Sequence, residues 1–189
     1  MGHGGPLLLS LWLVATCFTV AGAAVATEPQ EVWLQVDTRL LELRVLRGHE
    51  VIRRYTGIAI GRSGATADKR HLDGKTPLGE FRINRIADDS PFHRFFGFDY
   101  PHLAQAKRAF EQGDLDAPAY QAIRQAIYLH RDPPQHTALG GFLGIHGIGR
   151  GDPKMHEDFN WTQGCIALTN EQIDELRQWV RLGTRVVVY

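Results

Sequence analysis

Short stretches in which apolar and polar side chains alternate restrict the fold of this sequence more than any other feature. Val32, Leu34 and Val36 face one way, while Gln35 and Asp37 face the other. A two-residue period is typical of strands with one buried face. Further short runs predict strands over residues 41–45, 51–60, 80–86, 141–147 and 185–189. We therefore expect a mainly β protein of the α+β class, with residues 27–189 forming one domain.

A helical segment interrupts these strands between about residues 88 and 135. Asp116 can cap a helix in which Tyr120, Ile123 and Ile127 lie on one face. We expect this segment to be an insertion that lies over one side of the sheet as a lid.

A second helix is predicted near the end of the chain. Thr169 and Gln172 have the spacing of a capping box, in which each side chain bonds the other residue's backbone amide. The apolar residues Ile173, Leu176 and Val180 then form its buried stripe. Cys165 lies just before the start of this helix.

The first residues differ in character from the rest. Residues 6–26 contain no charged side chain and end in Ala24-Val25-Ala26, which has the A-x-A form of a signal-peptidase site. We interpret residues 1–26 as a signal peptide. An uncleaved membrane anchor is the alternative, because about twenty apolar residues can span a bilayer. Either interpretation places the functional part outside the cytoplasm, in the periplasm or cell envelope.

Charge and histidine spacing argue against two classes of function. The 21 basic and 21 acidic residues cancel, and no basic stripe with interleaved aromatic residues is present, so we expect no nucleic-acid partner. His130, His136, His146 and His156 fall in one stretch, but their spacing matches no compact ligand pattern. We therefore expect no metal site.

Cysteine usage is informative because the chain has two cysteines and the predicted leader contains Cys17. Removal of the leader leaves Cys165 alone, so it cannot form a disulfide within the chain. It is a buried filler, a bridge between two chains, or a reactive group.

Two segments favour the reactive group. His146 is followed by Gly147, and Cys165 is preceded by Thr162, Gln163 and Gly164. A nearby imidazole can accept the proton of a nucleophilic thiol, and we expect it to lower the thiol pKa below its ordinary value of about 8.5. A glycine before the cysteine allows successive amides to point at one spot, which suits an oxyanion. The amides of Gln163, Gly164 and Cys165 are the candidates.

These segments resemble a known family. The His146-Gly147 dipeptide followed by TQGCI at residues 162–166 is similar to the signature of the L,D-transpeptidase catalytic domain, or YkuD domain. Upstream, GKTPLGEF at residues 74–81 resembles its T-P-x-G-x-[FY] segment. The resemblance covers the chain from about residue 32 to 189.

The resemblance implies a β-sandwich that holds Cys165 as nucleophile and His146 as general base and proton donor at the floor of a cleft. A backbone carbonyl near the His-Gly dipeptide, here that of Gly147, would orient the imidazole, and Gln163, Gly164 and Thr162 would line the cleft. Members of this family attack peptidoglycan stem peptides and transfer the acyl group to an amine or to water. No metal or organic cofactor is implied, and we expect a monomer.

One position departs from the family pattern. Many members carry Arg two residues after the cysteine, where this chain has Ala167. The same cysteine could instead serve a wall-trimming hydrolase, either an amidase or an L,D-carboxypeptidase. A non-catalytic wall-binding module is a further alternative. His156 is a competing candidate for the base.

Overall fold

The computed structural model describes residues 1–2 and 31–189. The signal peptide predicted over residues 1–26, with Cys17, thus lies outside the described residues except for Met1 and Gly2. No helix of the described part is both long and apolar enough to cross a bilayer.

The body of the molecule is a sheet of eight strands, which confirms the mainly β class. Their order across the sheet is β3-β2-β1-β10-β6-β7-β8-β9. The strands are β1 (Val32–Asp37), β2 (Glu42–Arg47), β3 (Glu50–Thr56), β6 (Gly79–Ser90), β7 (His93–Phe98), β8 (Gly144–Gly147), β9 (Ile166–Leu168) and β10 (Arg185–Val188). A separate two-stranded sheet joins β4 (Ala65–Thr66) to β5 (Thr76–Pro77).

The expected sandwich is built from one continuous sheet, because the long strand β6 belongs to both halves. Its first residues pair with β10, where Phe81 lies opposite Val186, and its later residues pair with β7, where Ile83 lies opposite Phe98. The register of the second pairing shifts twice along β6. Such irregularities bend and twist a strand, which allows it to leave one half of the sheet and enter the other.

The alternation read from the sequence produces the core. Leu34 and Val36 of β1 are completely buried, and so are their β2 partners Val45 and Leu43. Cross-strand pairs of this kind stabilise a sheet, and each fully buried aliphatic side chain contributes about 1.5–3 kcal/mol. The predicted period of two is confirmed here.

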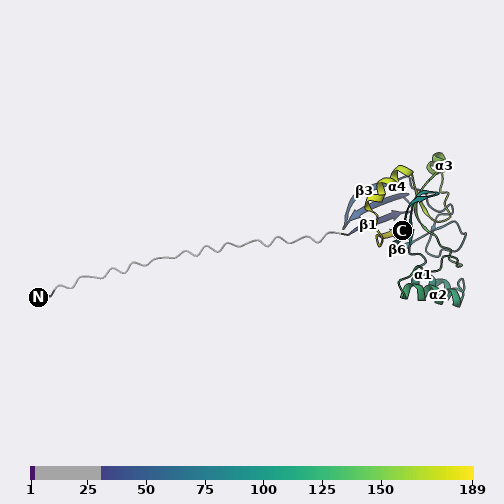
Figure 1. Cartoon of the computed structure of the whole chain (residues 1–189), viewed down its shortest axis with the longest axis horizontal. Helices are drawn as coiled ribbons and strands as arrows, with labels where there is room; N and C mark the ends of the chain where they lie inside the picture. The colour runs from purple at the N-terminus through teal and green to yellow at the C-terminus, as the bar shows by residue number, and fades with distance from the viewer. Residues whose placement is uncertain (3–30) are drawn as a thin grey trace.

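Helices α1 (Leu103–Glu111) and α2 (Ala117–Tyr128) lie together at one end of the molecule (Figure 1). Asp116 caps α2 as predicted, since its side chain accepts a hydrogen bond from the Ala119 amide. The predicted start of the helical segment, at residue 88, was wrong. The residues up to Phe98 complete β6 and form β7, because aromatic side chains that alternate along β7 are buried when it pairs with β8.

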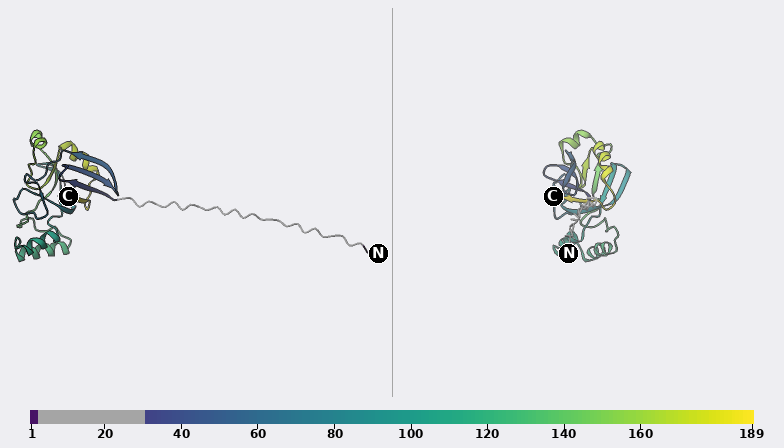
Figure 2. Two further views of the ribbon diagram at one scale, coloured as in Figure 1. Left: turned by 180° about the vertical axis from the view of Figure 1, so that it is seen from behind. Right: turned by 90° about the vertical axis from the view of Figure 1, so that its left-hand side faces the viewer.

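The C-terminal helix α4 (Asn170–Leu176) begins with the predicted capping box between Thr169 and Gln172. A 3₁₀ turn over Arg177–Trp179 follows it. The helix contacts β7 and β8, so it lies beside the strand that carries His146. A short helix, α3 (Pro153–Asp158), protrudes at the opposite end of the molecule from α1 and α2 (Figures 1 and 2).

Candidate active site

Parallel pairing of β8 with β9 brings His146 and Cys165 together. In this register Ile145 lies opposite Ile166, and His146 lies opposite Ala167. Because side chains alternate between the two faces of a strand, Cys165 points to the same face as His146. The thiol and the imidazole both line one cleft.

His146 is held in one tautomer by its own neighbour. The ring is buried, and Nδ1 lies 2.7 Å from the Gly147 carbonyl oxygen, so Nδ1 carries the proton and donates it. Nε2 is left as the basic nitrogen. The ring packs against Phe92 at 4.4 Å and Trp161 at 5.7 Å between centroids. Burial lowers the pKa of His146, against the effect of the Gly147 hydrogen bond, so the imidazole is neutral at neutral pH and can accept a proton.

The Cys165 thiol is protonated in the resting site. It lies 3.6 Å from the Phe142 carbonyl oxygen, to which it donates. Burial raises the pKa of the thiol to about 11, although a hydrogen bond from the Gly144 amide and the positive charge of Lys69 act in the opposite direction. Our expectation of a thiol pKa below its ordinary value was wrong, because desolvation disfavours the anion more than the surrounding dipoles favour it. Cys165 therefore rests as a neutral thiol and His146 as a neutral imidazole, rather than as an ion pair.

This protonation state gives a testable pH dependence. We expect the rate of Cys165 alkylation by iodoacetamide to rise about tenfold per pH unit from pH 7 to pH 10, because only the thiolate reacts and its fraction grows with pH below the pKa. Stopped-time labelling followed by mass spectrometry measures this, with free glutathione as the reference that levels off earlier. A plateau below pH 8.5 would instead indicate a preformed thiolate.

The turn before Cys165 is fixed by Thr162. The buried Thr162 hydroxyl donates to the Cys165 carbonyl at 2.6 Å and accepts from the Gly164 amide at 3.1 Å. Gly164 has φ +132°, and a Cβ there would lie 2.5 Å from the Lys75 carbonyl oxygen, so the position requires glycine. Because its amide is already bonded, Gly164 leaves the set of candidate oxyanion donors. The amides of Gln163 and Cys165 remain.

Two polar residues that the sequence analysis missed support this arrangement. Asn170 clamps the loop after His146, since its Oδ1 accepts from the Gly149 amide at 2.9 Å and its Nδ2 donates to the Gly149 carbonyl at 2.8 Å. Thr76, from the segment similar to T-P-x-G-x-[FY], is completely buried and accepts from the Gly61 amide at 2.8 Å. Both contacts join residues far apart in the chain, so sequence spacing did not indicate them.

The cleft has a volume of about 470 Å³ and mostly apolar walls. None of the lining residues that the structure describes comes from α1 or α2, so the expectation that the helical insertion forms a lid was wrong. The chain that follows the helices forms one wall instead, at residues 135–136 and 140–143. The lining residues are Lys69, His71, Leu72, Phe92, Phe95, Gln135, His136, Gly140, Gly141, Phe142, Leu143, His146, Trp161, Thr162, Gln163 and Cys165.

His156 lies behind this cleft rather than in it. The side chain is buried on α3, and its Nδ1 accepts from the Trp161 indole at 3.3 Å. It does not line the cleft, whereas His71, His136 and His146 do. Of these three, His146 lies on β8, which pairs with the strand that follows Cys165. Among the residues that the structure describes, no group of three or more histidine, cysteine or acidic side chains could hold a metal ion.

A family model for the L,D-transpeptidase catalytic domain (YkuD) matches residues 31–188. No curated protein matches the chain by sequence.

Solved structures share the fold at low sequence identity. The helical cell shape determining protein Pgp2 from Campylobacter jejuni is 21% identical, with a TM-score of 0.56 over 85% of this chain and 48% of that one. Bd1075 from Bdellovibrio bacteriovorus is 17% identical, with a TM-score of 0.55 over 85% of this chain and 48% of that one. The chain thus spans about half the length of these relatives.

Proposed function

Because the chain belongs to the L,D-transpeptidase catalytic domain family, we propose that it is an exported enzyme that acts on peptidoglycan stem peptides through an acyl-Cys165 intermediate. One observation carries this proposal: the thiol and a neutral imidazole of fixed tautomer share one face of neighbouring parallel strands and one cleft. Its site of action, the periplasm or cell envelope, rests on the leader read from the sequence.

The first half of the reaction forms a thioester. His146 Nε2 takes the thiol proton as Cys165 Sγ attacks the carbonyl between the third stem residue and D-alanine. We assign the stabilisation of the oxyanion to the amides of Gln163 and Cys165. The carbon–nitrogen bond then breaks, and the imidazolium returns its proton to the amine of the departing D-alanine.

The second half releases the acyl group. His146 takes a proton from water or from the amine of another stem, which attacks the thioester, and the thiol leaves with that proton. The Gly147 carbonyl holds the imidazole in the required tautomer through both halves, a role that a carboxylate plays in other hydrolases.

Water is the acceptor that we favour. Ala167 is completely buried and exchanges both backbone hydrogen bonds with Ala59, so no charged side chain enters the cleft from this position. Of the cleft-lining residues that the structure describes, none is aspartate or glutamate. The cleft thus lacks a carboxylate that could hold the ammonium group of an acceptor stem, whereas water needs none. We therefore propose wall trimming as the main activity, with cross-linking as the minor one.

Product analysis tests this choice. We expect a disaccharide tetrapeptide to yield tripeptide and free D-alanine, with trimers and dimers at less than about a tenth of the product, because the acceptor amine is held weakly. Mass spectrometry of timed digests measures both products, with Cys165→Ala as the blank. Abundant dimers would show instead that transpeptidation is the main activity. The Ala167→Arg variant is unsuitable here, because the long side chain has no space where the methyl group is enclosed.

A wall-binding module without catalysis remains the competing hypothesis. It predicts peptidoglycan pull-down that is insensitive to alkylation of Cys165. The catalytic proposal predicts instead that turnover falls in proportion to the labelled fraction.

An enzyme that trims stems would alter the wall without adding cross-links. We therefore expect loss of this enzyme to affect cell shape.

A further inference from the structure

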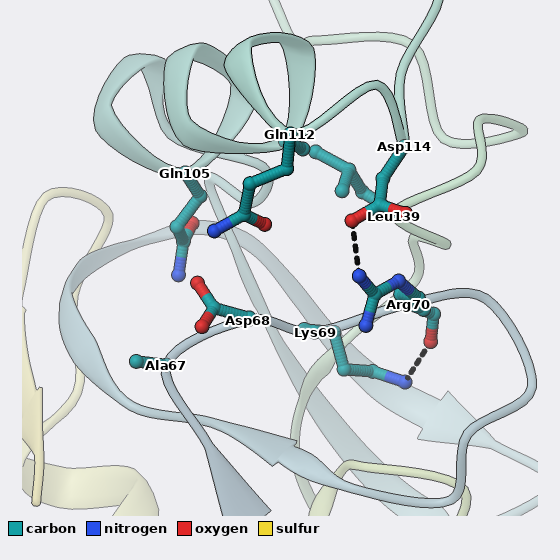
Figure 3. A pocket seen from close by; sticks show the side chains of 9 residues that line it. Ala67, Asp68, Lys69, Arg70, Gln105, Gln112, Asp114 and Leu139 are labelled. Carbon is teal, nitrogen blue, oxygen red and sulfur yellow. Dashed lines mark hydrogen bonds and ion pairs between the residues drawn. The ribbon is translucent and has the colours of Figure 1, made fainter.

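A lysine is buried in the wall of the catalytic cleft. The Lys69 side chain is only 3% exposed, yet it lines the same cleft as Cys165 and His146. On its other side it borders a small cavity of about 10 Å³ beneath α1, where it is seen beside Asp68 and Arg70 (Figure 3). A charged side chain is rarely buried to this extent without a specific partner.

Its partner is Asp73 of the same loop. Lys69 Nζ donates to Asp73 Oδ1 at 2.5 Å and to the Arg70 carbonyl at 2.8 Å. Asp73 also accepts from the amides of Arg70 and Lys75, at 2.8 and 2.9 Å. Burial alone would raise the pKa of Asp73, but these hydrogen bonds hold it below its ordinary value. The carboxylate is therefore a fixed anion that keeps the lysine in place.

The lysine lies directly against the turn that carries the nucleophile. A Cβ on Gly164 would be 3.1 Å from Lys69 Cε, which shows how closely the lysine stem approaches this turn. No other lysine or arginine lines the cleft within the described residues, and no carboxylate does. The remaining titratable groups around the thiol are His71, His136 and His146.

We propose that Lys69, held by Asp73, is a positioning residue that supplies the positive charge stabilising the anionic forms of Cys165. This inference rests on the proposed function for its catalytic meaning, but not for its effect on the thiol. An ammonium group has three N–H donors. In the part of the chain that the structure describes, Lys69 donates two hydrogen bonds to protein oxygens, which leaves one proton available toward a thiolate or an oxyanion.

Electrostatics point in the same direction. The charge of Lys69 lowers the pKa of the thiol against the larger effect of burial. A cation held in a water-poor cleft acts more strongly on a developing anion than one in solvent, and its orientation is fixed before the reaction. The lysine thus partly offsets the desolvation that keeps Cys165 protonated at rest.

Alkylation of Cys165 in the full chain tests the inference, because two substitutions are expected to change the labelling rate in opposite directions. Lys69→Met keeps the length of the stem and removes the charge, so we expect the labelling rate by iodoacetamide at pH 9 to fall about tenfold. Asp73→Asn keeps an oxygen that can accept the hydrogen bond from Lys69 Nζ but removes the counter-charge. The ammonium then stays in place and is less neutralised, so we expect the rate to rise about threefold. Lys69→Arg should restore most of the wild-type rate, because it keeps the positive charge.

Controls separate an electrostatic role from a structural one. Lys107→Met removes an exposed lysine on α1 that pairs with Glu111 far from the cleft, and it should leave the labelling rate unchanged. Thermal unfolding of every variant checks the fold. If Lys69→Met is unstable because it leaves the Asp73 carboxylate unpaired, the double variant Lys69→Met/Asp73→Asn removes that buried charge as well. A rate that falls in both Lys69→Met and Asp73→Asn, or in neither, would overturn the inference.

Turnover of tetrapeptide muropeptide by the same variants distinguishes the two proposals. We expect kcat to follow the labelling rate while KM stays within about twofold, since Lys69 acts on the thiol. Labelling rates that shift with opposite signs while the wild-type protein turns over no muropeptide would support Lys69 and contradict the proposed function. Labelling rates that do not change in the variants, together with full muropeptide turnover, would contradict the role of Lys69 and support the proposed function.

Discussion

Cys165→Ala is expected to reduce the release of D-alanine from muropeptides by at least about a thousandfold, because covalent catalysis cannot proceed without the sulfur. The fold should persist. The side chain is partly buried, and its hydrogen bonds are weak contacts with backbone groups: Sγ donates to the Phe142 carbonyl and accepts from the Gly144 amide. We expect the variant to lose less than about 2 kcal/mol of unfolding free energy.

The two measurements are muropeptide turnover by mass spectrometry and urea unfolding followed by tryptophan fluorescence. Cys165→Ser is the matched control, since it keeps a small nucleophilic atom that His146 cannot activate as well. Turnover by Cys165→Ala at more than a few per cent of the wild-type rate would remove the nucleophile assignment.

His146→Gln is expected to lower kcat by about 10²–10⁴-fold, the usual contribution of a general base. The effect should be large at neutral pH because the thiol, with a pKa of about 11, cannot lose its proton without a base. The direction in which this loss of kcat changes with pH follows from the thiol pKa. Thiolate forms without help as the pH approaches 11, so the deficit of the variant should shrink between pH 8 and pH 10.

The matched control for this change is His156→Gln. That residue is also buried and also contacts Trp161, but it does not line the cleft. We expect its kcat to stay within about tenfold of wild type. Pre-steady-state release of D-alanine is the measurement, and a larger loss in His156→Gln than in His146→Gln would transfer the role of base to His156.

Local patterns determined much of the fold. The alternation at Leu34 and Val36 predicted buried strands, and the spacing of Thr169 and Gln172 predicted a capped helix. Both features depend on residues within a few positions of each other, where backbone geometry alone decides which side chains share a face. The His-Gly and Gly-Cys motifs could likewise be recognised in the sequence, because each consists of neighbouring residues.

The helical segment shows where such reasoning stopped. Asp116 fixed the start of α2, yet the sequence did not reveal that residues 93–98 pair with β8. Aromatic residues such as Phe96 and Phe98 are compatible with core positions in either a strand or a helix. Only pairing with a distant strand decided between them.

The protonation state of the site was decided by tertiary structure alone. The His-Gly and Gly-Cys motifs suggested that His146 would ionise Cys165, but the pKa of the thiol depends on burial, which is a property of the whole fold. For the same reason the sequence singled out Cys165 and His146 but not Lys69. A motif determines which groups are present, whereas desolvation and the contacts of distant loops, here Lys69 and Asp73 against the Gly164 turn, determine which charges they can carry.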